Sequence, residues 1–99
     1  MFKKYINEKV IVRGDRSGVF FGILAAKDGK EVELKDCRRL WYWEGANSIS
    51  EIAVNGVKKP EKCKFTVAVE SIVITDAIEI IKCTNNAINS IESVKEWTY

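Results

Sequence analysis

The chain has 99 residues, of which 46% are hydrophobic and 30% are charged, so we expect residues 1–99 to form a single domain with a thin core. Its net charge of +2 at neutral pH excludes the strongly basic class of non-specific nucleic-acid binders, and any site for an anion must therefore be local. The start of the chain lacks the apolar core of a signal peptide, and no stretch reaches the ~18 apolar residues of a membrane span, which predicts a cytoplasmic protein with no membrane partner.

The first predicted hairpin begins with residues 9–13, which are rich in the β-branched side chains that strands favour. Residues 14–18 then gather turn formers, with Ser17 inside a turn that two glycines bracket. Such a turn either closes a plain hairpin or also presents its backbone amides to an anion.

Residues 19–26 form the second predicted strand, which Gly22 interrupts. An isolated glycine inside a strand marks a bulge or a bend, and such a bend lets a small sheet curl. The Asp-Gly pair within residues 27–30 predicts the next tight turn. Residues 31–35 then alternate polar and apolar side chains, which predicts a strand with one buried face.

The following strand, residues 35–43, contains two of the four arginines and two of the three tryptophans of the chain. Because alternate residues of a strand share a face, Arg39, Trp41 and Trp43 are predicted on one face and Arg38 on the other. One interpretation is a core face with solvated arginines at the strand end. The other is that guanidinium and indole groups together bind a flat, anionic ligand such as a nucleotide.

The second half of the sequence opens with a short predicted helix. Ser48 and Glu51 have the spacing of a capping box, and Gly56 is a suitable C-terminal stop. Residues 57–64 form a basic loop that ends at Lys64. Its lysines either confer solubility or border the anion site.

Three apolar segments and a helix complete the chain. Residues 65–69 predict a short strand, whereas residues 70–75 and 77–82 either pair with each other or form one bent strand, because periodicity alone does not separate these alternatives. Residues 84–94 have the cap and the apolar spacing of a helix. Trp97, in the tail, is expected to dock on its own domain or on a neighbouring subunit.

This order of elements predicts an α+β, mainly β fold. We expect a small curled antiparallel sheet or barrel of SH3-like or Sm-like type, with a short central helix and a C-terminal helix.

The available residue types argue against an enzyme. The chain has no histidine, so Ser/His and Cys/His nucleophile pairs are excluded, and glycine motifs that cradle phosphate are absent as well. Cys37, Cys63 and Cys83 are widely spaced without a zinc-binding pattern, and we expect reduced thiols in half-buried positions. The sequence therefore predicts no catalytic activity, no cofactor and no metal.

Binding is the chemistry that remains. Arg13 and Arg16 flank the first hairpin, and adjacent antiparallel strands can bring them to the aromatic strand in one basic, ring-lined recess. A small domain offers little concavity, so a pocket forms more easily between subunits, which predicts a homo-oligomer. The predicted ligand-binding residues are Arg13, Arg16, Ser17, Arg38, Arg39, Trp41, Trp43 and Lys64.

Much of the chain resembles an uncharacterised family of short phage and prophage proteins. The resemblance rests on residues 34–57, continuing through Pro60 and residues 63–65, and on residues 17–22 and 78–80. More loosely, the chain is similar to phage anti-defence sponges, small oligomeric proteins that sequester the cyclic nucleotide or cyclic ADP-ribose signals of bacterial immunity without cleaving them. In strand pattern it is also similar to the ring-forming, RNA-binding Sm-like barrels.

Three hypotheses follow. The first is a phage-encoded, non-catalytic protein of the host bacterial cytoplasm that sequesters a nucleotide-derived immune signal of systems such as Thoeris or CBASS. The second is an Sm-like accessory protein that binds RNA or DNA, with a steep salt dependence. The third is a structural or partner-binding phage protein in which the tryptophans are core or interface.

Overall fold

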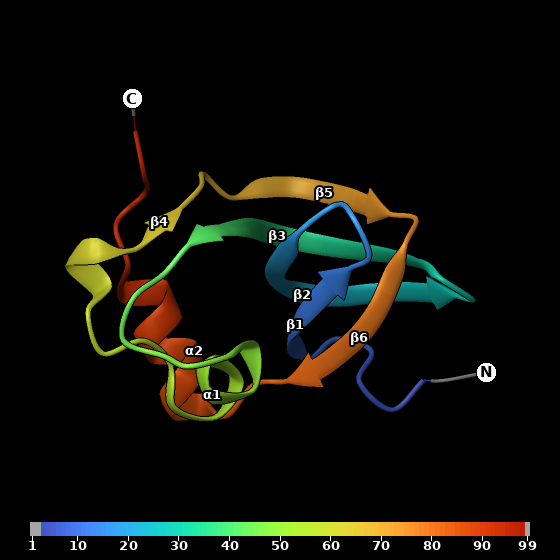
Figure 1. Cartoon of the computed structure of the whole chain (residues 1–99). Helices are drawn as coiled ribbons and strands as arrows, with labels where there is room; N and C mark the ends of the chain where they lie inside the picture. The colour runs from blue at the N-terminus through green and yellow to red at the C-terminus, as the bar shows by residue number, and fades with distance from the viewer. Residues whose placement is uncertain (1–2, 99) are drawn as a thin grey trace.

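Six strands and two helices are present in the computed structural model, which describes residues 3–98 (Figure 1). The strands are β1 (Lys9–Gly14), β2 (Val19–Asp28), β3 (Glu31–Tyr42), β4 (Lys64–Phe65), β5 (Val69–Ile74) and β6 (Ala77–Lys82), and the helices are α1 (Ile49–Asn55) and α2 (Asn85–Ser93), with a 3₁₀ turn, η1, at Pro60–Lys62. The expected mainly β fold with a central and a C-terminal helix is confirmed.

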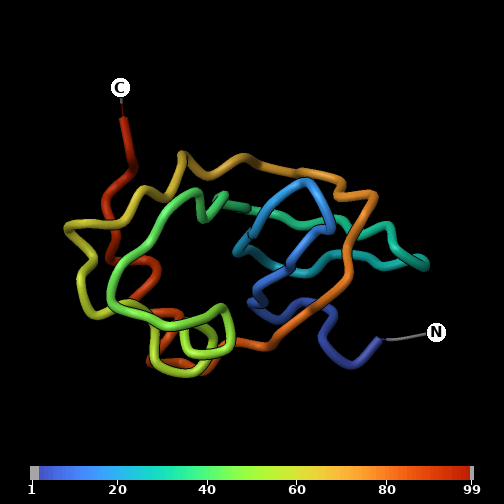
Figure 2. The backbone as a smooth tube through the Cα atoms, viewed as in Figure 1, coloured from blue at the N-terminus to red at the C-terminus, as the bar shows by residue number. Residues whose placement is uncertain are grey.

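All strand pairs in the sheet are antiparallel. β1, β2 and β3 form a meander; β6 then pairs with the free side of β1, while β4 and β5 share the free side of β3. The chain between β5 and β6 turns a corner at Thr75 and Asp76 and so crosses from one edge of the meander to the other (Figure 2). β5 and β6 do not pair with each other, so the hairpin alternative for these segments is wrong. The sheet is curled, and it is not closed into a barrel.

Two strand boundaries differ from the sequence prediction. The alternating segment and the aromatic segment form one strand, β3, because both pair with β2. The strand predicted at residues 65–69 is limited to Lys64–Phe65, since β3 changes partner from β4 to β5 along its length. Long-range pairing decides both boundaries, and it leaves no signal in the local periodicity.

The bend predicted at Gly22 is confirmed, and the structure gives its cause. Gly22 of β2 lies opposite two residues of β3, Asp36 and Cys37. Asp36 has a φ of 49°, in the left-handed region, so the extra residue of this bulge belongs to β3. A Cβ on Gly22 would lie 3.0 Å from the carbonyl oxygen of Lys35, so any larger residue would push the two strands apart by a few tenths of an ångström.

Two apolar clusters lie on the two faces of the curled sheet. The first fills the space between the sheet and the helices and includes Ile11, Phe21, Leu40, Ile52, Phe65, Ala87 and Ile91. The second lies inside the curl and includes Val10, Val12, Phe20, Leu24, Val32, Leu34, Cys37 and Ile74. Because both faces are covered, three consecutive residues of β1 are fully buried.

The predicted helix caps are present, with one change of partner. Ser48 Oγ accepts a hydrogen bond from the Glu51 amide at 3.3 Å, but Glu51 Oε1 accepts from the Asn47 amide at 2.7 Å and not from that of Ser48. Gly56 ends α1 with a φ of 76°, and the Thr84 side chain caps α2.

All three cysteines are free thiols. Burial raises the pKa of Cys37 and of Cys83 to about 12, so neither thiol forms a thiolate readily. Cys63 alone is half-buried as expected; the other two lie fully inside the core. Within residues 3–98, no helix combines the length and the apolar character needed to cross a membrane.

Candidate functional site

Arg38 and Arg39, adjacent in sequence, project to opposite faces of β3, as strand alternation predicts. The Arg38 guanidinium turns toward α2 and donates to three backbone carbonyls: those of Thr66 at 2.9 Å, Phe65 at 3.2 Å and Ile91 at 3.2 Å. Ile91 lies in the last turn of α2, where a cation also complements the helix dipole. Partial burial lowers the pKa of Arg38. These three hydrogen bonds, the Arg38 ties, link β3 to β4, to the loop that follows it and to α2.

Arg39 lies on the face of β3 that is turned away from the helices, beside Phe20 of the second apolar cluster. Its guanidinium carbon is 4.5 Å from the ring centroid of Phe20, its cross-strand neighbour, and Nη1 donates to the Ser17 carbonyl at 2.6 Å. Within residues 3–98 its side chain makes no ion pair and no second hydrogen bond by the usual geometric limits. Four of its five N–H donors therefore have no hydrogen-bond acceptor among the described residues.

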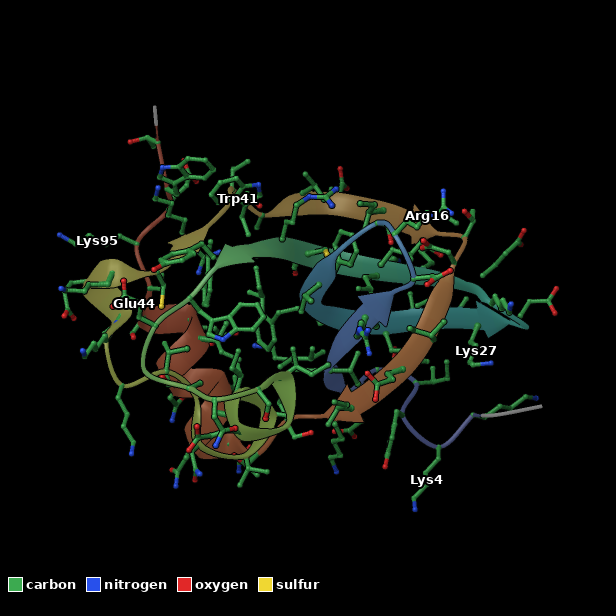
Figure 3. The ribbon with its side chains drawn as sticks, viewed as in Figure 1. Lys4, Arg16, Lys27, Trp41, Glu44 and Lys95 are labelled. Atoms are coloured by element: carbon green, nitrogen blue, oxygen red, sulfur yellow. The ribbon has the colours of Figure 1, made fainter. Side chains whose placement is uncertain are left out.

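Two surface hollows meet at Arg39 and Ser17. The larger, of about 590 Å³, is lined by Ser17, Gly18, Val19, Arg39, Leu40, Trp41 and Trp43. The second, of about 390 Å³, is lined by Arg16, Ser17, Phe20, Arg39 and residues 72–76. Four predicted site residues thus share the larger hollow, and Arg16 joins Ser17 and Arg39 in the second. Figure 3 shows the labelled Trp41 and Arg16 near opposite ends of β5.

The turn that carries Arg16 and Ser17 is held by Asp76. Its Oδ2 accepts from the amides of Arg16 at 2.8 Å and Ser17 at 3.1 Å, and its Oδ1 accepts from Ser17 Oγ at 2.6 Å. The Ser17 hydroxyl and these amides lower the pKa of the Asp76 carboxyl. Because the amides of Arg16 and Ser17 are already occupied, the suggestion that the turn presents them to an anion is wrong.

An aromatic and cationic cluster borders the larger hollow. The Trp41 ring is stacked on that of Trp97, with centroids 5.0 Å apart. The Lys64 ammonium lies 5.5 Å from the centroid of Trp41 and 5.4 Å from that of Trp97. Trp97 is anchored because its amide donates to the Phe65 carbonyl at 2.8 Å. The expected docking of Trp97 on its own domain is confirmed.

The remaining predicted residue, Arg13, lies outside both hollows. Its guanidinium forms an exposed ion pair with Glu79 of β6, at 3.2 Å. Trp43 is half-buried and packs against the helix-side cluster while also lining the larger hollow. Trp41 is 58% exposed, so the two tryptophans divide between surface and core.

The comparisons with known proteins identify a family but no function. A domain of unknown function, DUF6948, matches residues 7–91, most of the chain. The chain belongs to the DUF6948 family. No curated protein matches it significantly in sequence. The DUF6948 match includes all eight predicted site residues, and Trp97 lies beyond its end.

Sequence reasoning missed three residues around the DUF6948 hollows. Phe20 supports Arg39 across the strand pair, Asp76 fixes the first turn, and Trp97 stacks on Trp41. Two of them offered a signal: the isolated aspartate between two apolar runs, since a carboxylate in that setting needs partners, and the tail tryptophan, whose docking was expected but not its partner. The contact of Phe20 depends on strand register, and that of Trp97 on the path of the C-terminal tail.

Proposed function

We propose that this DUF6948 domain is a non-catalytic, phage-encoded protein that sequesters a nucleotide-derived immune signal in the host bacterial cytoplasm. The signal would be of the cyclic oligonucleotide or cyclic ADP-ribose type. The observation that carries the proposal is the larger hollow, in which the partly unused guanidinium of Arg39 lies beside the indoles of Trp41 and Trp43. The phage origin and the anti-defence role proposed for the domain rest on its resemblance to short phage and prophage proteins and to phage anti-defence sponges.

The chemistry of the hollow suits a flat anion. A guanidinium binds phosphate oxygens through parallel N–H donors, and an indole face offers stacking to a base of any sequence. A volume of about 590 Å³ lies within the range of roughly 300–1,000 Å³ that small-molecule sites occupy. No described residue supplies the hollow with a histidine or a nucleophile-base pair, so binding without turnover is the simplest use of these groups.

Isothermal titration calorimetry with cyclic dinucleotides, cyclic trinucleotides and cyclic ADP-ribose isomers tests the proposal. We expect one of these classes to bind and to be recovered unchanged after incubation. Arg39→Ala should weaken the binding at least ~10-fold, whereas Arg13→Ala, which removes the same charge outside both hollows, should leave the affinity unaltered. A folded protein that gives no heat with the whole panel contradicts the proposal.

A second candidate, binding of single-stranded RNA or DNA, is favoured by the stacked, exposed pair Trp41 and Trp97 with Lys64 beside it. Such a platform suits successive stacked bases. Nucleic-acid binding predicts affinity that rises with oligonucleotide length and falls steeply with salt, because each neutralised phosphate releases counterions. A small ligand with one to three phosphates gives a much shallower salt dependence.

A further inference from the structure

The outer edge of β5 is an unpaired strand edge. β5 pairs with β3 on one side only, and among the described residues no backbone hydrogen bond outside that ladder involves residues 69–74. Figure 1 shows β5 running along the outside of the molecule, with no element beyond it. Its outward amide and carbonyl groups are thus free to pair with another strand.

The two edges of this sheet differ in how well they are protected against pairing with the strand of another molecule. β6, the opposite edge, carries Glu79 and Lys82, which form ion pairs with Arg13 at 3.2 Å and Glu8 at 3.8 Å. β5 has only one charged residue, Glu70, and neither lysine nor proline, and its register with β3 is unbroken. Charges, prolines and bulges are the usual means by which edge strands avoid pairing, and β5 lacks nearly all of them.

Apolar side chains are exposed along this same edge. Val69 is 41% and Val73 58% exposed on the strand, and Val67, just before it, is 52% exposed. A cluster of exposed valines on an unprotected edge is typical of a strand that is covered in its working state.

We propose that β5 pairs with β5 of a second copy, antiparallel about a two-fold axis at Ser71, to form a homodimer. In that register Val69 faces the partner's Val73, and Glu70 faces the partner's Ile72. The strand is therefore complementary to itself, because no two like charges oppose each other and the exposed valines cover one another. Residues 72–74 line the smaller hollow, so the partner strand lies about 5 Å from that side of the candidate site.

A disulfide across the axis tests the register. Residues facing each other in an antiparallel pair have Cα atoms about 4.5–5.5 Å apart, within the range that a disulfide spans. Cys63, the half-buried thiol, is replaced by serine in all variants. On mild oxidation Ser71→Cys should form a covalent dimer rapidly at micromolar concentration. Ile78→Cys, at a 46% exposed position on β6, should not.

Sedimentation velocity over a concentration series, without any nucleotide, tests the dimer itself. We expect the wild-type chain to dimerise, and Val73→Lys to weaken the dimer at least tenfold, because it adds a desolvated charge at the pairing edge. Ile78→Lys, the matched change on β6, should leave it intact. Circular dichroism confirms that both variants are folded.

Three results overturn this inference. A wild-type monomer at several hundred micromolar means that the edge receives a strand from a different protein or none. A dimer that tolerates Val73→Lys, or one that crosslinks as readily through Ile78→Cys as through Ser71→Cys, uses another surface. Because no ligand is present in these measurements, their outcome is separate from that of the proposed sequestering function.

Discussion

Arg38 and Arg39 are chemically identical neighbours whose environments differ completely. Arg38 faces the helices and gives three hydrogen bonds to carbonyls of β4, the following loop and α2. Arg39 lies on the opposite face of β3, where its guanidinium contacts the Phe20 ring and gives one hydrogen bond to the first turn. The Arg-Arg pair is therefore not one binding motif: one guanidinium holds the fold together, and the other is available at a hollow.

The largest expected effect is on the Arg38 side. Arg38→Ala should lower the free energy of unfolding by about 3 kcal/mol, because three part-buried carbonyls lose a charged donor. Urea denaturation measures the loss. Arg13→Ala is the control, since its exposed ion pair contributes about 1 kcal/mol or less. A loss below about 1 kcal/mol for Arg38→Ala would show that α2 does not depend on this tie.

Arg39→Ala should show the reverse pattern. We expect about 1–2 kcal/mol of lost stability, less than for Arg38→Ala, because one hydrogen bond and one cation–π contact are removed at a partly exposed position. Affinity for a ligand from the calorimetric panel should fall at least ~10-fold, by the loss of a charge-assisted phosphate contact. If Arg39→Ala destabilises the fold as much as Arg38→Ala does, the two arginines do not have separate roles.

Trp97→Ala probes the aromatic border of the Arg39 side. Loss of the stack on Trp41 should cost about 1 kcal/mol of stability in Trp97→Ala, and Trp97→Phe, which keeps a ring, should restore most of it. Both variants keep the same two tryptophans, so their fluorescence can be compared directly. The emission of Trp97→Ala should lie further to the red, because the Trp41 ring becomes more hydrated. Equal emission in the two variants would mean that Trp41 keeps its position without the tail.

The smallest expected effect is a pH dependence carried by Asp76. Its folded pKa is lowered, chiefly by the Ser17 hydroxyl, below the unfolded value of about 3.9. The stabilisation is therefore fully present above about pH 4 and is lost as pH falls through the folded pKa. Acid should loosen the turn that positions the Ser17 carbonyl for Arg39 before it affects the Arg38 ties.

Urea midpoints measured between pH 7 and pH 2 for the wild type and for Asp76→Asn check this expectation. The variant should lack the part of the acid-induced loss that the carboxylate causes, and so its profile should be flatter below pH 4. Identical profiles in the two proteins would show that the turn does not depend on the charge of Asp76.

Local features of the fold could be predicted because their causes are local. The helix starts at Ser48 and Thr84 and the stop at Gly56 follow from one residue and its immediate neighbours. Gly22 marked the position of the bend, but the extra residue of the bulge lies on the partner strand β3. The limits of the strand at residues 65–69 were predicted incorrectly. The pairing of the segments that form β5 and β6 was left open. They depend on which edge each strand joins, a choice between contacts distant in sequence.

The chemistry of the candidate site follows from the sequence, since guanidinium and indole groups cluster on β3 and strand alternation separates Arg38 from Arg39. Which of the two arginines has its hydrogen-bond donors occupied within the fold depends on tertiary contacts. That outcome depends on the carbonyls which α2 and the loop after β4 bring to one face of β3. Likewise, the structure alone left β5 as an unprotected edge, because edge status belongs to the assembled sheet and not to any strand within it.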